Sequence, residues 1–331
     1  MSRPSEDEII ARYLAPLAGP GGLGLRDDAA LATPRAGHDL VVSTDMLVAG
    51  VHFFADDPAG AIARKALRVN LSDLAAKAAR PTGVLLGLAL PHDWTEPWLA
   101  EFCAGLADDL RAFDCALLGG DTVGTPGPLT ISITAFGEVA SGRMVPRTGA
   151  RAGDALFVSG TIGDAALGLR VRIAAPEDAD WIAALDAADR AHLLDRYLLP
   201  RPRLALRPAL AHARAAMDVS DGFVGDLAKM LALEGLSTTL AAARVPLSPA
   251  AAAASRGRPG VLAAALTGGD DYEILCAVAP DRVAAFEAEA AKLDFGVTRL
   301  GTARSGSGGV VVEDDGGRGI ALASQRHEHF S

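Results

Sequence analysis

The residues best suited to chemistry in this chain are carboxylates that stand beside hydroxyl groups or glycines. Ser43, Thr44 and Asp45 place two hydroxyls and a carboxylate in succession, directly after the apolar run 40–42. Hard oxygen ligands of this kind suit Mg²⁺ better than zinc or copper. The same three residues could instead cap a turn or a helix, and this stretch alone does not decide between the two roles.

Other acids stand in comparable settings further along the chain. Asp28 follows Asp27, and adjacent aspartates repel each other unless cations or amide donors hold them. Asp121 follows two glycines, which let a backbone approach a ligand closely and expose amides to phosphate oxygens. Each motif alone is also typical of a solvated loop, a turn or a helix cap. The full set of acids in such positions is Asp28, Asp45, Asp73, Asp121, Asp218 and Asp221.

Convergence of these acids in one cleft would produce strong mutual repulsion. Several Mg²⁺ ions with a nucleoside triphosphate would offset that repulsion. A formal net charge of −10 makes a nonspecific nucleic-acid or anionic-membrane binder a poor fit for the chain. The sequence therefore favours a metal-assisted site for a phosphate-rich small ligand.

The hydrophobic pattern predicts the elements that must position these acids. A buried strand is predicted over 40–42 with Asp45 at its end, because strand ends can hold polar groups rigidly beside solvent. A helix is predicted from Asp57-Pro58 to about Arg80, with Asp73 on a polar stripe at the edge of its buried face. A strand is predicted over 84–90, and Thr95-Glu96-Pro97 is predicted to begin a helix that runs through Phe113. A second short strand, 116–118, is predicted to end in a turn at Gly119, Gly120 and Asp121.

The chain has 331 residues, which suggests two domains, expected at 1–145 and 146–331. Alternating strands and helices predict an α/β first domain, and the second is expected to be α+β. The Ala- and Pro-rich stretch 241–259 is expected to be a surface excursion. In the second domain, strands are predicted over 155–159, 274–278, 297–301 and 309–313, and helices over 223–234 and 281–292.

Three cysteines and the N-terminus indicate the cellular compartment. Cys103, Cys115 and Cys276 are odd in number and form no CxxC pair, so they read as buried apolar residues in a reducing cytosol. The polar N-terminus has no signal-peptide core, and no apolar run approaches the roughly 20 residues that span a bilayer. We therefore expect a cytoplasmic protein without membrane segments.

Several familiar catalytic motifs do not occur in the sequence. There is no Walker A loop, no kinase HRD–DFG pair, no serine-nucleophile elbow and no HExxH zinc motif around His327 and His329.

The acidic motifs, taken in order, resemble those of one enzyme family over nearly the whole chain. They are Asp27-Asp28-Ala29-Ala30, Ser43 to Phe53, Asn70-Leu71-Ser72-Asp73-Leu74-Ala75-Ala76, Gly119-Gly120-Asp121-Thr122, Asp218-Val219-Ser220-Asp221-Gly222 and Gly268-Gly269-Asp270-Asp271-Tyr272-Glu273. The set is similar to that of thiamine-monophosphate kinases. The resemblance implies a two-domain α/β fold shared with aminoimidazole ribonucleotide synthetase, a homodimer built through the N-terminal sheets, ATP and Mg²⁺ as cosubstrates, and thiamine diphosphate as product.

The resemblance also implies roles for individual residues. The Mg²⁺ ligands would be Asp28, Ser43, Thr44, Asp45, Asp73, Asp121, Asp218 and Asp221. ATP would contact Gly120, Asp121, Arg147 and Ser220. Thiamine monophosphate would face His52, Asp270 and His327. The chain departs from the family pattern at Arg26 (usually Gly), Lys77 (often Met), Asp270 (usually Glu) and His327 (a C-terminal aromatic residue).

The chemistry of this family suits an acid-rich site. The acceptor oxygen of a phosphate monoester is already ionised at neutral pH, so no general base and no catalytic side chain are expected. We therefore expect direct in-line transfer of the γ-phosphoryl group of ATP to thiamine monophosphate. Two alternatives remain open: another ATP-dependent synthetase of the same superfamily, and a non-catalytic nucleotide-binding partner protein.

Overall fold

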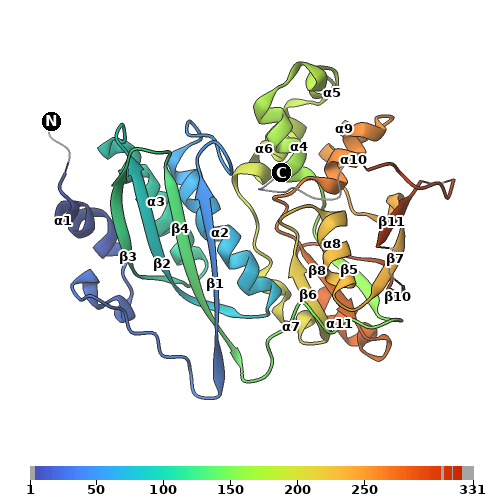
Figure 1. The fold of residues 1–331 in the computed structure, drawn as a ribbon, viewed down its shortest axis with the longest axis horizontal. Helices are drawn as coiled ribbons and strands as arrows, with labels where there is room; N and C mark the ends of the chain where they lie inside the picture. The colour runs from blue at the N-terminus through green and yellow to red at the C-terminus, as the bar shows by residue number, and fades with distance from the viewer. Residues whose placement is uncertain (1–3, 307–308, 315, 323–331) are drawn as a thin grey trace. The chain divides into compact units, whose positions relative to one another are not determined.

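The computed structural model describes residues 4–306, 309–314 and 316–322, and the chain divides into two compact units. Unit 1 comprises Met1–Leu74 and Ala79–Met144, and unit 2 comprises Ala75–Ala78 and Val145–Ser331. Each unit combines sheet and helices, which confirms the predicted fold class (Figure 1). Among the described residues, no helix has both the length and the apolar character needed to cross a bilayer.

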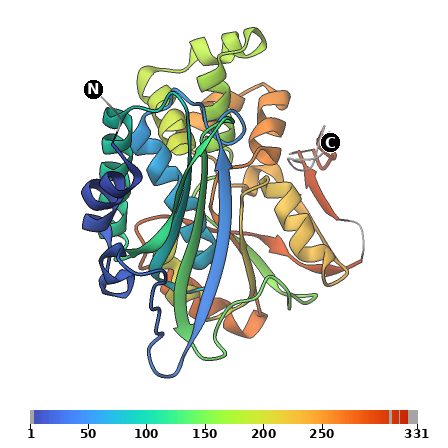
Figure 2. The same cartoon turned by 60° about the vertical axis from the view of Figure 1, so that its left-hand side comes forward.

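Unit 1 is a four-stranded sheet with two long helices across one face (Figures 1 and 2). Its elements are α1 (Glu6–Ile9), the short turns η1 (Ile10–Leu14), η2 (Ala15–Leu17) and η3 (Pro20–Leu25), β1 (His38–Val48), α2 (Ala59–Ala76, whose last two residues belong to unit 2), β2 (Arg80–Pro91), α3 (Glu96–Ala112), β3 (Ala116–Thr125) and β4 (Thr130–Ala140). The strand order is β1-β4-β2-β3. Strands β2 and β3 run parallel, and the other two neighbouring pairs are antiparallel.

Alternating side chains explain why this sheet has one covered face. On β4, Ile131 and Ile133 are buried, while Ser132 and Thr134, which alternate with them, are partly exposed, as the period of a half-buried strand requires. The predicted start of α3 is confirmed, because Thr95 Oγ1 accepts a hydrogen bond from the amide of Trp98.

The predicted end of the preceding helix is wrong. Helix α2 stops at Ala76, Ala78 has a left-handed φ of +56°, and Pro81 lies inside β2 instead of marking a helix end. A register shift between Pro81 and Gly83 accommodates the missing amide of the proline within the sheet. Strand β2 therefore begins at Arg80, four residues before the start of the strand predicted from the apolar run 84–90.

Glu138 on β4 is a buried acid that binds two arginines of unit 1, Arg35 and Arg80. Its carboxylate accepts from the Arg35 amide at 3.0 Å and from Arg80 Nη2 at 2.6 Å, and Arg35 Nε lies 2.6 Å away. Burial raises the pKa of Glu138, but the Arg35 amide and the two guanidinium groups outweigh it and lower the pKa to about 2. Glu138 is therefore a stabilising, fully ionised residue at neutral pH.

Unit 2 contains two sheets and a set of shorter helices. Its strands are β5 (Ala155–Ser159), β6 (Ala213–Asp218), β7 (Leu236–Ala241), β8 (Ile274–Val278), β9 (Val297–Thr302), β10 (Arg304–Ser305) and β11 (Val310–Glu313). Its helices are α4 (Asp164–Ile173), α5 (Ala179–Ala184), α6 (Ala187–Leu198), α7 (Arg207–Leu210), α8 (Phe223–Ala232), α9 (Pro249–Ser255), α10 (Pro259–Thr267) and α11 (Val283–Ala290), with 3-10 turns η4 (Pro176–Asp178), η5 (Leu204–Leu206), η6 (Ala242–Arg244) and η7 (Pro280–Arg282). The sheets have the orders β6-β8-β5-β9 and β10-β7-β11.

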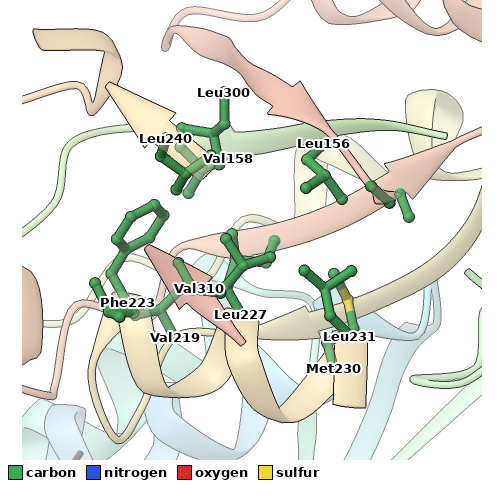
Figure 3. Close-up of a cluster of buried hydrophobic side chains, with 14 of the residues drawn as sticks. Leu156, Val158, Val219, Phe223, Leu227, Met230, Leu231, Leu240, Leu300 and Val310 are labelled. Atoms are coloured by element: carbon green, nitrogen blue, oxygen red, sulfur yellow. The ribbon is translucent and has the colours of Figure 1, made fainter. Parts of the chain in front are cut away.

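The core of unit 2 lies on both faces of its four-stranded sheet. On one face, Phe223 and Leu227 of α8 pack among aliphatic side chains of β5, β7 and β11 (Figure 3). On the other face, the rings of Phe157 and Phe286 lie 4.7 Å apart, centroid to centroid. The predicted strands at β5 and β8 are confirmed, and Cys276 on β8 is buried, as are Cys103 and Cys115 in unit 1.

The expected surface excursion at 241–259 is wrong in part. Ala250, Ala251 and Ala254 of α9 are buried against Trp181 and Leu193. Alanine contributes little to a hydrophobic pattern, so a helix that packs closely through alanines resembles a polar loop in sequence. Helix α9 is therefore a core element of unit 2.

Candidate active site

The Ser43-Thr44-Asp45 motif lies in the middle of strand β1, not at a strand end as predicted. The strand continues to Val48, so successive side chains point to opposite faces of the sheet. Ser43 and Asp45 lie on the helix-covered face. Thr44 lies on the other face, where its hydroxyl donates to Ile133 O at 3.1 Å and accepts from Thr134 Oγ1 at 3.1 Å. The structure therefore separates the Thr44 hydroxyl from the side chains of its two neighbours.

Helix α2 holds the other two residues of this motif. The hydroxyl of Ser43 donates to Asp73 Oδ2 in a short hydrogen bond. The amide of Asp45 donates to Asn70 Oδ1 at 2.9 Å, and Asn70 is fully buried with its Nδ2 bonded to Ala66 O. Strand β1 is an edge strand, so Asn70 satisfies an amide that no neighbouring strand can reach. Two predicted metal ligands, Ser43 and Asp73, are thus in direct contact.

Asp28, Gly120 and Asp121 line one cavity of about 880 Å³ in unit 1. Its walls also include apolar residues of β2 and β3, such as Leu86 and Leu118. A cavity of this size, apolar with a few polar groups, is typical of a small-ligand site.

The Gly119-Gly120-Asp121 motif is not the predicted turn, because β3 runs through it. Gly120 has φ +155°, and a Cβ built on it would lie 1.8 Å from Leu86 O on β2. The parallel pairing of β3 with β2 therefore requires glycine at this position. Asp121 faces the cavity from a strand, where its backbone is fixed more firmly than in a turn.

His52 lies in the turn that follows β1. Its Nδ1 accepts a hydrogen bond from the Val48 amide at 3.0 Å, so neutral His52 carries its proton on Nε2. The ammonium of Lys65, which is 2% exposed, donates to His52 O at 3.1 Å. Sequence analysis missed Lys65, although a lysine on the apolar face of a predicted helix was a usable signal. The two contacts fix both the backbone and the ring of His52.

In unit 2, Asp218, Ser220 and Asp221 follow one another at the end of β6. Asp218 is buried, and Asp221 lies 3.2 Å from the ammonium of Lys229. Asp221 does not cap α8, because the residue preceding that helix, Gly222, has no side-chain cap. The turn is held by a further acid, Asp226, which sequence analysis missed.

Asp226 lies in the first turn of α8 and reaches back to the turn before the helix. Its Oδ2 accepts from the amides of Ser220 at 3.1 Å and Asp221 at 2.9 Å. Burial raises the pKa of Asp226 to about 6, although the Asp221 amide and the Lys229 ammonium favour the charged form. Asp226 thus fixes the backbone from which the two predicted site residues project.

The loop that carries Asp270 lies against the same turn. Asp270 N donates to Ser220 O at 2.9 Å, and Tyr272 N donates to Val219 O at 2.8 Å. A Cβ on Gly269 would lie 2.2 Å from Ser220 O, so this close approach of two backbones requires glycine. The structure therefore brings Asp270 beside the Asp218–Asp221 segment.

The remaining predicted residues are less well defined by contacts. Arg147 is exposed. Lys77, in unit 2, donates from Nζ to Ala216 O at 2.8 Å, two residues before Asp218. Arg26 is exposed after η3. His327 lies outside the described residues. Within the described part of the chain, no three His, Cys, Asp or Glu side chains are grouped as a ready metal site.

Comparison with known proteins places these motifs in a family. The family model described as AIR synthase related protein, N-terminal domain, matches residues 26–139, and the corresponding C-terminal domain matches residues 151–314. The thiamine-monophosphate kinase of Caulobacter vibrioides is 44% identical over 311 residues, which cover 92% of this chain and 86% of that protein.

Solved structures give the same result. The crystal structure of thiamine-monophosphate kinase from Stenotrophomonas maltophilia K279a is 40% identical, with a TM-score of 0.77 over 90% of this chain and 91% of the other. The structure of AaThiL complexed with AMPPCP and TMP is 27% identical, with a TM-score of 0.76 over 98% and 94% of the two chains. On the strength of this identity and coverage, the chain belongs to the thiamine-monophosphate kinase family.

Proposed function

We propose that this protein transfers the γ-phosphoryl group of ATP to thiamine monophosphate, giving ADP and thiamine diphosphate. The observation that carries the proposal is the likeness, over 98% of the chain, to AaThiL complexed with AMPPCP and TMP. The 44% identity to the Caulobacter vibrioides kinase supports the same activity. Both comparisons span the two units, so they favour a complete enzyme over a partner protein that only binds nucleotide.

The donor set fits Mg²⁺ as the metal of this reaction. Every candidate ligand is a carboxylate or hydroxyl oxygen, which is the ligand class that Mg²⁺ prefers. In unit 1 the proposed ligands are Asp28, Ser43, Asp45, Asp73 and Asp121, and in unit 2 they are Asp218 and Asp221. Thr44 is left out of the proposed set, because its hydroxyl lies on the opposite face of β1 from Ser43 and Asp45. Bound Mg²⁺ would neutralise charge on the phosphate groups and so make an in-line transfer between two anions possible.

The residues of the chain supply positioning and no proton transfer. Gly120, Asp121, Arg147 and Ser220 are proposed to contact ATP, and Gly120 and Asp121 line the cavity of unit 1. His52 and Asp270 are proposed to contact thiamine monophosphate. Because Nδ1 of His52 accepts from the Val48 amide, the ring offers Nε2–H to an acceptor such as a phosphate oxygen.

A second copy of this chain is the proposed partner of unit 1. Leu40, Val42 and Met46 alternate along the outer strand β1 on the face that no helix covers, and they are 42%, 53% and 59% exposed. An apolar stripe on an edge strand invites pairing with another chain. Val42→Lys should convert a dimer to a monomer in light scattering, and a wild-type protein that is monomeric at micromolar concentration would refute the pairing.

One experiment tests the activity directly. The protein is incubated with ATP, Mg²⁺ and thiamine monophosphate, and the products are separated by chromatography. We expect ADP and thiamine diphosphate in equal amounts. Free thiamine should be a poor acceptor, because its alcohol needs a general base and we expect none in this acid-rich site. Efficient phosphorylation of thiamine, and none of its monophosphate, would overturn the proposal. The cytoplasmic location expected from the sequence stays a prediction.

A further inference from the structure

In the loop of residues 268–273, residues with a left-handed backbone alternate with buried acids. Asp270 and Tyr272 are half-buried and have left-handed φ values of +71° and +51°. Asp271 and Glu273, the residues that alternate with them, are 1% and 0% exposed. A left-handed backbone is unfavourable for a residue with a side chain, above all for a bulky one such as Tyr272. Contacts outside the loop must therefore hold it in this shape.

Glu273 makes the densest of these contacts. Its carboxylate accepts from Arg196 Nη2 at 2.8 Å, from Arg203 Nε at 2.6 Å and from the Ser159 hydroxyl at 2.7 Å. Arg203 Nη2 donates to the other carboxylate oxygen, so the Arg203–Glu273 pair is bidentate. A bidentate pair fixes direction as well as distance. The side chain of Glu273 is therefore held from α6, from β5 and from the segment before η5.

Close packing around Glu273 restricts the conformation of its side chain. A Cβ on Gly160 would lie 2.1 Å from Glu273 Oε1, so the carboxylate occupies the space of that missing side chain. The guanidinium of Arg203 also lies over the ring of Phe295 at 4.3 Å, which fixes its plane. Arg196 is 3% exposed, and its Nη1 has no hydrogen-bond partner among the described residues. Removal of the Glu273 carboxylate would leave the buried Arg196 and the largely buried Arg203 without this anionic partner.

Asp271 anchors the other buried position of the loop. Its carboxylate accepts from the amides of Gly163 at 2.7 Å and Ala165 at 3.3 Å, at the N-terminus of α4. The two buried acids thus contact different elements, while the amides of Asp270 and Tyr272, which precede them in turn, bond to Ser220 O and Val219 O. Each left-handed residue is therefore followed by a buried, hydrogen-bonded acid, and Gly269 before Asp270 packs closely on Ser220 O.

We propose that Glu273 and Arg203 form a positioning pair that sets the affinity for thiamine monophosphate. They hold the backbone of the loop so that Asp270 keeps its left-handed conformation and its side chain keeps its direction. They touch neither substrate, and they act only through Asp270. The inference rests on the proposed function, in which Asp270 contacts thiamine monophosphate.

The test compares Arg203→Gln with the matched control Arg201→Gln. Arg201 lies two residues earlier, is 54% exposed and pairs with Asp195 at 2.9 Å outside the loop network. We expect Arg203→Gln to raise the KM for thiamine monophosphate roughly tenfold, short of the hundredfold loss that a 1 Å misplacement can cause. The KM for ATP should not change, and Arg201→Gln should leave both constants at their wild-type values.

Two further measurements separate positioning from general stability. Arg203→Lys keeps the cation and loses the fork, so its KM for thiamine monophosphate should lie between the wild-type and Arg203→Gln values. Hydrogen exchange at the amides of Asp270 and Tyr272 should be faster in Arg203→Gln without any ligand, and unchanged in Arg201→Gln. If Arg203→Gln fails to fold, Arg203→Lys serves for the same comparisons.

The outcomes distinguish this inference from the proposed function. Equal increases in both KM values, or a lower melting temperature with both KM values unchanged, would overturn the positioning role. If the wild-type protein forms no thiamine diphosphate, the proposed function fails. The affinity role then fails with it, and the exchange measurement tests separately whether the pair holds the loop. Unchanged exchange at Asp270 and Tyr272 in Arg203→Gln would show that it does not.

Discussion

Gly120→Ala is the substitution that most directly tests the arrangement of the cavity wall. The Cβ of an alanine at this position would lie 1.8 Å from Leu86 O, 2.7 Å from Leu86 C and 2.9 Å from Leu86 N. All three are backbone atoms of β2, so no side-chain rotation can relieve the overlap. Strands β2 and β3 must move apart locally, or the left-handed backbone at residue 120 must change.

The expected cost follows from that separation. Moving the strands apart breaks about two ladder hydrogen bonds, each worth about 1 kcal/mol, and overpacking adds about 1 kcal/mol or more. We therefore expect a loss of about 3 kcal/mol for unit 1. That corresponds to a decrease in its melting temperature of roughly 6–12 °C, for a unit of this size.

Gly124→Ala is the matched control on the same strand, because a Cβ on Gly124 has no atom within 4 Å. Thermal unfolding followed by calorimetry and ATP binding followed by titration calorimetry would be measured for both variants. Gly120→Ala should unfold at lower temperature and bind ATP more weakly, and Gly124→Ala should match the wild type. Identical behaviour of the two variants would refute the close packing of β3 on β2 at the cavity.

Three more predictions concern single side chains. Asp121→Asn should lose most activity at limiting Mg²⁺ while melting no lower than wild type, because removing one charge from a repelling set relieves strain in the metal-free protein; near wild-type turnover would show that Asp121 binds no metal. Asparagine tolerates a left-handed backbone, so Asp270→Asn should keep the loop conformation, raise the KM for thiamine monophosphate several-fold and leave the KM for ATP unchanged. Steady-state kinetics in which both KM values changed together would contradict this. The folded pKa of Glu138, about 2, lies below its ordinary value of 4.5, so its contribution is complete above pH 4.5 and is lost as the pH falls towards 2. Because Arg35 is 60% exposed, solvent reduces the corresponding 3 kcal/mol to about 1–2 kcal/mol. Glu138→Gln should therefore be less stable than wild type by that amount in urea unfolding at pH 7 and by less at pH 3; an equal difference at both values would contradict it.

Elements with strong local signals could be predicted from the sequence. Thr95 caps α3 because a threonine before Glu-Pro is typical of a helix start, and continuous apolar runs marked β5 and β8 as buried strands. In contrast, Gly119 and Gly120 resembled a turn, since glycine is the usual turn residue. Here the glycine requirement comes from a neighbouring strand more than thirty residues earlier in the chain, and no local pattern carries that information.

In the candidate site, too, the residues with a local sequence signal could be predicted and the residues that depend on tertiary contacts could not. The acids themselves were visible because carboxylates at glycine-rich or hydroxyl-rich positions are uncommon in combination. The residues that hold them were not visible: Asp226 reaches back to two amides, and Asn70 reaches an edge strand 25 residues away. Such contacts depend on tertiary distance, so their residues read in sequence as an ordinary helical acid and an ordinary helical amide.

The course of helix α2 has a practical consequence for dissecting the protein. Its final residues and the turn after it, Ala75–Ala78, belong to unit 2, where Ala75 and Ala76 are buried in the same cluster as Phe157 and Phe286. A truncated gene ending at Met144 would carry these four residues away from the core they fill. The complementary fragment from Val145 would have a cavity beside two aromatic rings of its core, so we expect neither half to be a soluble product on its own. Recombination between related genes at this boundary should, for the same reason, rarely yield a stable chimera.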